Sequence, residues 1–408
     1  MKLIVYNNKG TFSTVLDAFL SIAQNKFERI DVYFPKSYID SQYKVGTNVK
    51  FHKPNLFTYV KAGGVAFCQM FSSFARNDYI IAKKTGKFDV GFLKNYFRTL
   101  VVSNALFFSS KEQIKKNLSD ICVFSTWYDA NAIAAAMVKY KYPQVQTMSY
   151  AHSYEVDFRK NRYTAVTGDC YKEKYLDKIL FISENVMKEY IELNREFLKY
   201  TSKYETIHFG SSKKYEGIAK ASDDGVFRLL SCSGISPVKR LELIVGALQL
   251  YNGQMVIEWT HLGSGNDEDK IRELIIGLGE RANVRVCLKG RLTNDEVHQY
   301  YSKKNIDMFI NVSASEGLPV SIMEAMSYGV PALATDVGGN SEIVTNETGY
   351  LVKADISSKE LAEFFEKLTL NVNQVTEKKE NAYRMWENQY QVNKNVERLV
   401  ACFYDTAI

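Results

Sequence analysis

Two glutamates, Glu316 and Glu324, lie on either side of the start of a predicted helix. Residues 307–312 have the apolar composition of a buried strand, and residues 313–317 form a loop of small residues after it. Pro319 occupies the position expected for the first residue of the helix. The spacing therefore places Glu316 just before the helix N-terminus and Glu324 in its second turn.

This arrangement of residues could bind a phosphorylated sugar. The free backbone N–H groups from Gly317 onward and the positive end of the helix dipole attract phosphate. In open α/β sheets, ligands bind at the carboxyl ends of strands, where this loop falls. Carboxylates on each side can accept hydrogen bonds from hydroxyls. Two glutamates at this spacing are ordinarily only part of a helix surface, but the ordered motifs around them favour a site for a sugar and a diphosphate.

The elements that must position these residues follow an α/β pattern. Short apolar runs alternate with amphipathic stretches in both halves of the chain, which is typical of parallel strands joined by crossover helices. A polar stretch rich in small residues, 211–225, separates the halves. The expected domains are residues 1–210 and 211–385, with a C-terminal helix, 386–408, that packs back on the first domain.

The composition supports two soluble domains with different electrostatic character. A chain of 408 residues suits two domains, and its 46% apolar and 24% charged residues argue against disorder. Residues 1–205 hold 30 Lys and Arg against 19 Asp and Glu, or +11, whereas the remainder has a charge of −5. A basic half suggests an anionic partner, either nucleic acid, a phosphorylated substrate or an acidic membrane face.

Most of the positive charge lies in one segment, residues 36–116. This segment has 14 Lys and Arg against 4 Asp and Glu, interleaved with many aromatic residues. Such a pattern suits a membrane interface or single-stranded nucleic acid. A solvated surface over a Phe-rich core is an equally plain explanation of it.

Cellular location is indicated by the cysteines and the N-terminus. The six cysteines are scattered, with no Cys-x-x-Cys pair, which favours free thiols in a reducing compartment. The N-terminal residues lack the apolar region of a signal peptide, and no stretch approaches the roughly 20 apolar residues of a membrane span. We expect a cytoplasmic protein.

Residues 315–352 closely resemble the C-terminal signature of the retaining glycosyltransferases of family 4, which have the GT-B architecture of two facing Rossmann-like domains with parallel sheets. The resemblance covers nearly the whole C-terminal half and is thinner in the N-terminal half. It includes the motifs at 229–233, 237–240, 261–265, 289–292, 125–128 and 151–159. These motifs are similar to those of the subgroup that builds capsular, exopolysaccharide or lipopolysaccharide chains.

The resemblance implies roles for individual residues. Glu316 would contact the donor sugar and Glu324 would hold the ribose hydroxyls. The amides of Gly317 and Leu318 would face the diphosphate and sugar. Lys239 matches the basic residue that neutralises the leaving diphosphate, a role that a fixed ammonium can perform because negative charge develops there.

Further donor contacts are implied for Gly263 and for a base-binding loop that contains Arg291 and Leu292. In the N-terminal half, Gly10 could approach the diphosphate through its backbone, although the double glycine usual in the family is missing. His152 resembles the histidine that contacts the transferred sugar or its near phosphate. A lone histidine of this kind can equally be a structural residue.

Two features depart from simple expectations. The family commonly has an arginine some five residues before the lysine, where this chain has Gly234, and Arg240 beside Lys239 could supply the missing charge. The run 267–269, Asp-Glu-Asp, formally matches the metal motif of a different glycosyltransferase fold. Acidic residues are common in the first turn of a helix, so we expect no metal and no cofactor.

The resemblance thus implies a retaining glycosyltransferase that moves a sugar from a nucleotide diphosphate, with a UDP-sugar favoured, to a hydroxyl of a glycan acceptor. The resemblance implies a polyprenyl-diphosphate-linked acceptor and a peripheral position on the inner face of the cell membrane. The basic segment 36–116 would contact the anionic membrane surface rather than nucleic acid. Two alternatives remain open: a non-catalytic partner subunit of another transferase, and an epimerase or phosphorylase on the same fold.

Overall fold

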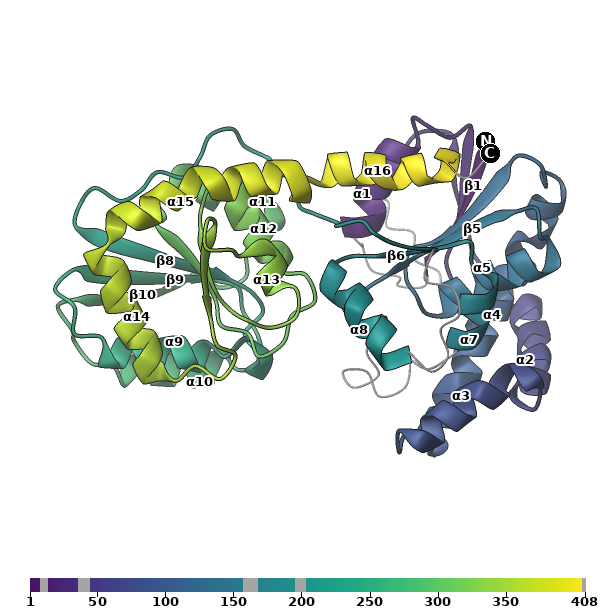
Figure 1. Cartoon of the computed structure of the whole chain (residues 1–408), viewed down its shortest axis with the longest axis horizontal. Coiled ribbons are helices and arrows are strands. Elements are labelled where there is room, and N and C mark those ends of the chain that lie inside the picture. The colour runs from purple at the N-terminus through teal and green to yellow at the C-terminus, as the bar shows by residue number, and fades with distance from the viewer. Residues whose placement is uncertain (8–13, 36–44, 157–167, 195–202, 406–408) are drawn as a thin grey trace. The chain divides into compact units, whose positions relative to one another are not determined.

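The computed structural model describes residues 1–7, 14–35, 45–156, 168–194 and 203–405 (Figure 1). The chain forms two compact units. Unit 1 comprises Met1–Phe209 and Asn393–Ile408, and unit 2 comprises Gly210–Val392. Each unit is built on a parallel sheet that is covered by helices, as the alternating sequence pattern predicts.

The sheet of unit 1 has seven strands in the described residues, in the order β3-β2-β1-β4-β5-β6-β7, and every neighbouring pair is parallel. The central strands are buried on both faces, which explains their nearly continuous apolar composition. The strands are β1 (Lys2–Tyr6), β2 (Arg29–Tyr33), β3 (Val49–His52), β4 (Ile121–Ser125), β5 (Gln146–Ala151), β6 (Lys178–Phe181) and β7 (Tyr204–Thr206).

The helices of unit 1 differ in how much apolar surface they bury. Along α4, residues from Phe92 to Ile114 pack inward, whereas α2 buries only Ala62 and Ala66. The helices are α1 (Thr14–Ala23), α2 (Leu56–Met70), α3 (Ser73–Lys84), α4 (Val90–Lys115), α5 (Ala130–Lys141), α6 (Ser153–Val156), α7 (Asp169–Tyr175) and α8 (Glu184–Asn194).

The sheet of unit 2 has six strands in the described residues, in the order β10-β9-β8-β11-β12-β13, again all parallel. Because the order reverses between β8 and β11, the carboxyl ends of these two strands form the crevice in which such sheets bind ligands. The strands are β8 (Val226–Cys232), β9 (Val256–Leu262), β10 (Val284–Leu288), β11 (Met308–Asn311), β12 (Ala332–Thr335) and β13 (Gly349–Val352).

Two apolar clusters in unit 2 lie between the sheet and its helices. Trp259, Phe365 and their neighbours form one cluster, and Tyr301, Tyr328 and Trp386 belong to the other. The helices are α9 (Leu241–Leu250), α10 (Glu268–Ile276), α11 (Asn294–Lys303), α12 (Val320–Ser327), α13 (Asn340–Ile343), α14 (Ser358–Leu370) and α15 (Val372–Met385), with a 3₁₀ turn η2 (Pro237–Lys239) and a π-helical turn η3 (Trp386–Tyr390).

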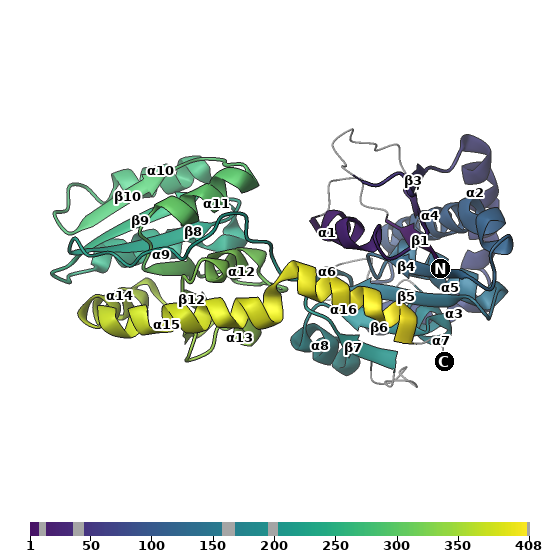
Figure 2. The same ribbon diagram turned by 90° about the horizontal axis from the view of Figure 1, so that it is seen from above.

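The last helix, α16 (Val392–Asp405), belongs almost entirely to unit 1. The ring of Phe403 contacts Phe27 and Phe124, and the Tyr404 hydroxyl donates to the Lys26 carbonyl. Figure 2 shows α16 lying with the strands of unit 1. The structure places the change of unit at 392/393, later than the residue 386 suggested by sequence, because η3 stays in the core of unit 2.

Candidate donor-binding site

Glu316 follows β11 and carries its carboxylate to a charged partner from another element. Its Oε1 accepts hydrogen bonds from Lys239 Nζ at 2.6 Å and from Asn311 Nδ2 at 3.2 Å. Lys239 ends η2, which follows β8, so the ion pair joins the carboxyl ends of the two central strands of the sheet. The two residues predicted to act on the donor are thus brought together.

The loop that holds Glu316 lies directly against a pair of glycines. A Cβ on Gly338 would overlap the Glu316 carbonyl, and one on Gly339 would overlap the Gly317 carbonyl. Gly338 also has a φ of 54°, which favours glycine, and the Gly339 N–H donates to the Gly317 carbonyl at 2.7 Å. The Thr-Asp-x-Gly-Gly motif therefore supports the backbone on which Glu316 is carried.

The N–H groups predicted to face phosphate are available in this loop. Within the described part of the chain, the N–H groups of Gly317 and Leu318 donate no hydrogen bond. They lie just before α12, which begins at Val320 with Pro319 as its N-cap, one residue later than the sequence suggested. The unused donors and the helix end together form an anion-binding surface beside Glu316.

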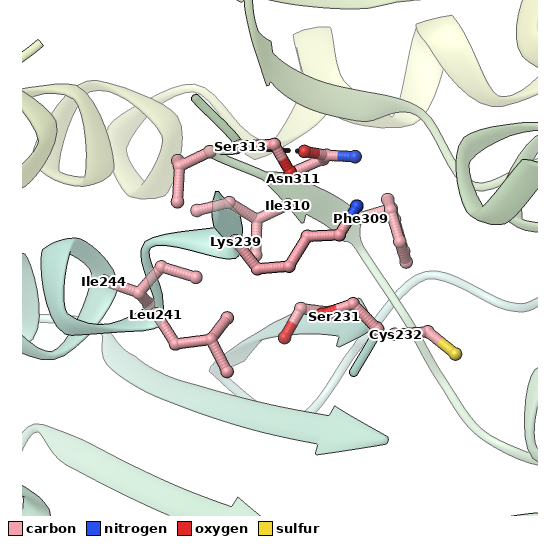
Figure 3. Close-up of a pocket in the computed structure, with 11 residues that line it drawn as sticks. Ser231, Cys232, Lys239, Leu241, Ile244, Phe309, Ile310, Asn311 and Ser313 are labelled. Atoms are coloured by element: carbon pink, nitrogen blue, oxygen red, sulfur yellow. Dashed lines mark hydrogen bonds between the residues drawn. The ribbon is translucent and has the colours of Figure 1, made fainter. Parts of the chain in front are cut away.

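Figure 3 shows the side chain of Lys239 extending between Ser231 and Cys232 on one side and Ile310 and Asn311 on the other. A small cavity of about 10 Å³ lies beside it, about enough for one water molecule. Lys239 keeps a quarter of its side chain exposed. Its ammonium is consequently held in place by packing while remaining accessible.

Arg240 has a different position from the one expected of a residue that replaces the missing arginine. Its guanidinium donates to the carbonyls of Val312 at 2.7 Å, Ala354 at 2.8 Å and Ser313 at 3.3 Å. Arg240 is also the non-glycine residue with positive φ, 50°, in the described chain. These contacts fix the start of α9 and the strand ends around Lys239, and the predicted contact of Arg240 with the donor stays a prediction.

Glu324, in contrast, has no ion pair with a Lys or Arg among the residues that the structure describes. Its Oε1 accepts a hydrogen bond from Asn294 Nδ2 at 3.0 Å and lies 3.9 Å from His298 Nε2, both on α11. Burial raises the pKa of Glu324 to about 7, against the lowering effects of the Asn294 hydrogen bond and the Lys214 charge. Burial lowers the pKa of His298 to about 4, so this imidazole is neutral at pH 7.

A cavity of about 310 Å³ opens next to these residues in unit 2, with Cys232 shared between it and the small cavity at Lys239. It contains the predicted donor residues Gly263, Arg291 and Leu292, together with Gly234. Gly263, at φ 140°, passes so close to the Ser233 carbonyl that a Cβ would overlap it, and its N–H donates to the Gly290 carbonyl at 2.8 Å. The volume is at the lower end of the range for small-molecule sites.

The sequence of unit 2 is similar to that of a known family of proteins. Residues 217–385 match the sequence model of the family described as glycosyl transferases group 1. These residues form a group 1 glycosyltransferase domain. The matched range contains Lys239, Glu316 and Glu324, together with every residue that lines the larger cavity.

One relative is the GtfA subunit of a UDP-N-acetylglucosamine–peptide N-acetylglucosaminyltransferase from Streptococcus agalactiae, 26% identical over 181 residues. That match covers 43% of this chain and 34% of the relative, so the chain spans about a third of the length of the streptococcal protein.

Two solved structures align with nearly all of the chain. The lipopolysaccharide outer core galactosyltransferase WaaB has a TM-score of 0.70 at 15% identity, over 99% of both chains. HepE from Anabaena, in complex with UDP, has a TM-score of 0.68 at 13% identity, over 99% of this chain and 100% of HepE. At such identities the likeness shows the fold, which is the predicted GT-B fold of two Rossmann-like units.

The predicted residues of unit 1 are separate from the glycosyltransferase domain in sequence. His152 follows β5, and its Nε2 lies 3.1 Å from the Thr126 carbonyl, so this nitrogen carries a proton. Its ring stacks on Trp127, with centroids 4.1 Å apart. The buried Glu155 accepts from the His152 backbone N–H and from that of Tyr128. Gly10 lies outside the described residues.

The residues that support the glycosyltransferase site were missed by sequence reasoning. Asn311 holds Glu316, and Asn294 and His298 flank Glu324. Thr293 and Glu296 form a capping box that starts α11, which was visible in the sequence as Thr-x-x-Glu. That signal, with the four-residue spacing of Asn294 and His298, could have placed both on one helical face.

The acidic run 267–269 lies at the start of α10, where Glu268 pairs with Arg272. Among the residues that the structure describes, no group of three or more His, Cys, Asp or Glu is arranged to hold a metal ion. A search of the same residues finds no helix that is both long and apolar enough to span a membrane.

Proposed function

We propose that this protein is a retaining glycosyltransferase that moves a sugar from a nucleoside-diphosphate donor to a hydroxyl of a glycan acceptor. The observation that carries the proposal is the Lys239–Glu316 pair at the switch point of the unit 2 sheet, beside unused N–H donors and a cavity. A cation, an anion and backbone donors at one edge suit a ligand that has both phosphate and hydroxyl groups.

The donor would extend along the carboxyl ends of the strands. The nucleoside would enter the cavity with Arg291 and Leu292, and the ribose hydroxyls would donate to Glu324. The diphosphate would meet Lys239 and the N–H groups of Gly317 and Leu318. UDP is the favoured nucleotide, since the streptococcal relative is named for a UDP-sugar and HepE was solved with UDP.

Transfer with retention needs no protein nucleophile in this proposal. The leaving phosphate oxygen would take the proton of the acceptor hydroxyl as the new glycosidic bond forms on the same face. Lys239 would stabilise the negative charge that develops on the leaving diphosphate, and Glu316 would orient the sugar. Because Arg240 is engaged by three backbone carbonyls, Lys239 would be the main side-chain cation at the diphosphate.

Release of nucleoside diphosphate from a panel of UDP-, GDP- and ADP-sugars tests this proposal. We expect one donor to be consumed by the wild type and the rate to fall about 100- to 1,000-fold in Glu316→Ala. Glu280→Ala, which changes an exposed glutamate of the same unit, is the matched control and should behave as wild type. Equal release by wild type and Glu316→Ala would overturn the catalytic assignment.

We further propose that the acceptor is lipid-linked, as a polyprenyl diphosphate, and that unit 1 binds the inner face of the cell membrane. In support, α2 turns apolar side chains to solvent. Leu56 is 81% exposed, Phe57 77% and Phe71 78%. Together with Val60 and Phe67 they form what we call the α2 face. Figure 1 shows α2 and α3 at the periphery of unit 1.

Basic residues lie on α2 and α3. Lys61 lies on the same helix, and Lys83 and Lys84 end α3, all exposed. Each basic residue near an anionic leaflet contributes on the order of 1 kcal/mol, and apolar side chains can enter the interface. Neutralising five of the basic residues together (Lys83, Lys84, Lys87, Lys94 and Arg98) should weaken binding to anionic liposomes. Unchanged binding would contradict the membrane proposal.

A second candidate function is that of a subunit in a larger transferase. The streptococcal relative is named as a subunit, and Gly234 stands where the family has an arginine. The panel experiment separates the two candidates. Turnover by the isolated wild type supports the enzyme, whereas donor binding without turnover by the isolated chain supports the subunit.

A further inference from the structure

His298 is a buried histidine that the proposed transfer does not use. It lies on α11 with its side chain 1% exposed, and its Nδ1 is 3.0 Å from the Tyr328 hydroxyl. Its Nε2 has no hydrogen-bond partner among the described residues. A buried polar atom without a partner is uncommon in folded proteins, so this one requires an explanation.

The surroundings of Tyr328 determine which nitrogen of His298 carries the proton. The Tyr328 oxygen already accepts hydrogen bonds from the backbone N–H groups of Tyr215 at 3.2 Å and Lys214 at 3.4 Å. With both lone pairs engaged, the hydroxyl can only donate, and His298 Nδ1 is its acceptor. The neutral ring therefore carries its proton on Nε2.

The Nε2–H group is directed at Glu324. His298 and Asn294 are four residues apart on α11, as are Glu324 and Tyr328 along α12 and its C-cap, so the two pairs face each other. Asn294 already binds Glu324 Oε1 at 3.0 Å, while His298 Nε2 is 3.9 Å from the same oxygen. That distance is too long for a hydrogen bond and short enough to close if a bound ligand moves the carboxylate.

We infer that His298, fixed as its Nε2–H tautomer by Tyr328, is a positioning residue that holds the Glu324 carboxylate ionised and oriented for the two ribose hydroxyls of the donor. The inference rests on the proposed function. A carboxylate that accepts two hydroxyls must be deprotonated, and a neutral donor behind it favours the ionised form without adding a competing positive charge.

Other groups around Glu324 also influence the ionisation of its carboxyl group. Asn294 and the Lys214 charge favour its ionised form, whereas burial opposes it. Burial and the Glu324 charge raise the pKa of the nearby Cys232 and Tyr301, so both of these groups stay protonated and neutral. Asp295 and Lys214 act on His298 in opposite directions. Each of these groups remains in place when His298 alone is changed. A His298 variant therefore measures the effect of the Nε2–H group by itself.

The test is UDP binding measured by calorimetry from pH 5.5 to 8.5. Wild-type affinity should rise with pH as Glu324 ionises and then level off. His298→Leu, which lacks both nitrogens, should bind UDP about tenfold more weakly at pH 7 and level off at a higher pH. His298→Gln, whose amide N–H can replace Nε2–H, should recover most of the affinity. The UDP affinity of Tyr328→Phe should lie between those of His298→Leu and His298→Gln.

Two comparisons keep the outcomes distinct. In a Glu324→Gln background, which removes the carboxylate and keeps the titration of UDP itself, His298→Leu should have no further effect on affinity. A His298→Leu protein that melts earlier but keeps the wild-type affinity and pH profile would overturn the inference and leave His298 structural. If the wild type binds none of UDP, GDP and ADP, the proposed function fails instead.

Discussion

The two units differ in which side chains lack a partner within the protein. In unit 2, the charged groups at the strand ends are partnered: Lys239 binds Glu316, Arg240 binds three carbonyls, and Glu324 accepts from Asn294. In unit 1, α2 exposes most of its apolar residues and buries only two alanines. A small helix of this composition would ordinarily turn its phenylalanines inward.

This difference indicates what each unit would bind: a small ligand at the site of unit 2 and a covering surface at the α2 face of unit 1. The site of unit 2 is preorganised, since its partners hold Lys239 and Glu316 in place before any ligand arrives. The α2 face exposes apolar surface to water, and burying that surface against a partner would be favourable in free energy. We therefore expect substitutions in unit 2 to alter chemistry and nucleotide binding, and substitutions on α2 to alter location.

The largest effect should come from Lys239→Met. Methionine keeps much of the side-chain volume and removes the ammonium that binds Glu316, so the leaving diphosphate would lose the cation that we propose for it. We expect donor turnover to fall about 100- to 1,000-fold with membrane binding unchanged, measured by nucleotide release and liposome sedimentation. Lys304→Met, at an exposed lysine of unit 2, is the control. If both variants lost only a small and equal fraction of donor turnover, Lys239 would have no role in the transfer.

Next in size is the effect of Phe57→Asp with Phe71→Asp on α2. Two charges on the α2 face should reduce binding to anionic liposomes more than tenfold while nucleotide release from a soluble donor stays within about twofold of wild type. Leu370→Asp is the matched control, because Leu370 is 83% exposed and lies in unit 2. Equal loss in the α2 variant and the control would mean that the α2 face is not the membrane contact.

The segment of unit 2 that carries Glu316 could be predicted from sequence because its determinants are local, whereas its partner Lys239 lies 77 positions away. The strand, loop and helix around Glu316 follow one another within a few residues, and Gly338 and Gly339 mark the backbone contact that supports the loop. The parallel α/β architecture likewise follows from apolar runs that alternate with amphipathic segments. In both cases neighbouring residues determine the structure.

The remainder depends on contacts between distant segments. The engagement of Arg240 with Val312 and Ala354 crosses more than 70 positions of sequence, and no pattern around Arg240 indicates it. Asn294 and His298 meet Glu324 only because α11 packs beside α12. The residue at which the chain returns to unit 1 was also misplaced, because η3 continues a helical sequence whose packing, rather than composition, decides its unit.

The pH dependence of stability would sharpen the picture of unit 2. Glu324 has a pKa of about 7 when folded against an ordinary 4.5, so between these values the folded state keeps a proton that the unfolded state has released. Its contribution to the free energy of unfolding therefore falls as pH rises from about 4.5 to 7. His298, with its pKa lowered to about 4, has the opposite effect from about pH 4 to 6.5.

The difference between Glu324→Gln and wild type isolates the glutamate, since His298 is common to both. We expect the variant to gain about 2–3 kcal/mol relative to wild type between pH 4.5 and 8, measured by urea unfolding at each pH. A constant difference across this range would show that Glu324 ionises as an ordinary surface carboxyl. The burial of its side chain would then have no energetic consequence.

The smallest effect, and a gain, should come from Gly234→Arg. A Cβ at Gly234 would meet only the Ser264 carbonyl, at an ordinary 3.8 Å, and the position lines the donor cavity. A guanidinium there would add a cation near Lys239 at the proposed diphosphate site, and we expect UDP to bind about 3- to 10-fold more tightly. Gly234→Ala, which fills the same space without charge, should leave the affinity unchanged. Since salt screens this added attraction, the gain in affinity should shrink at 0.5 M NaCl. A gain that persists at high salt would come from packing and would indicate that the diphosphate lies elsewhere.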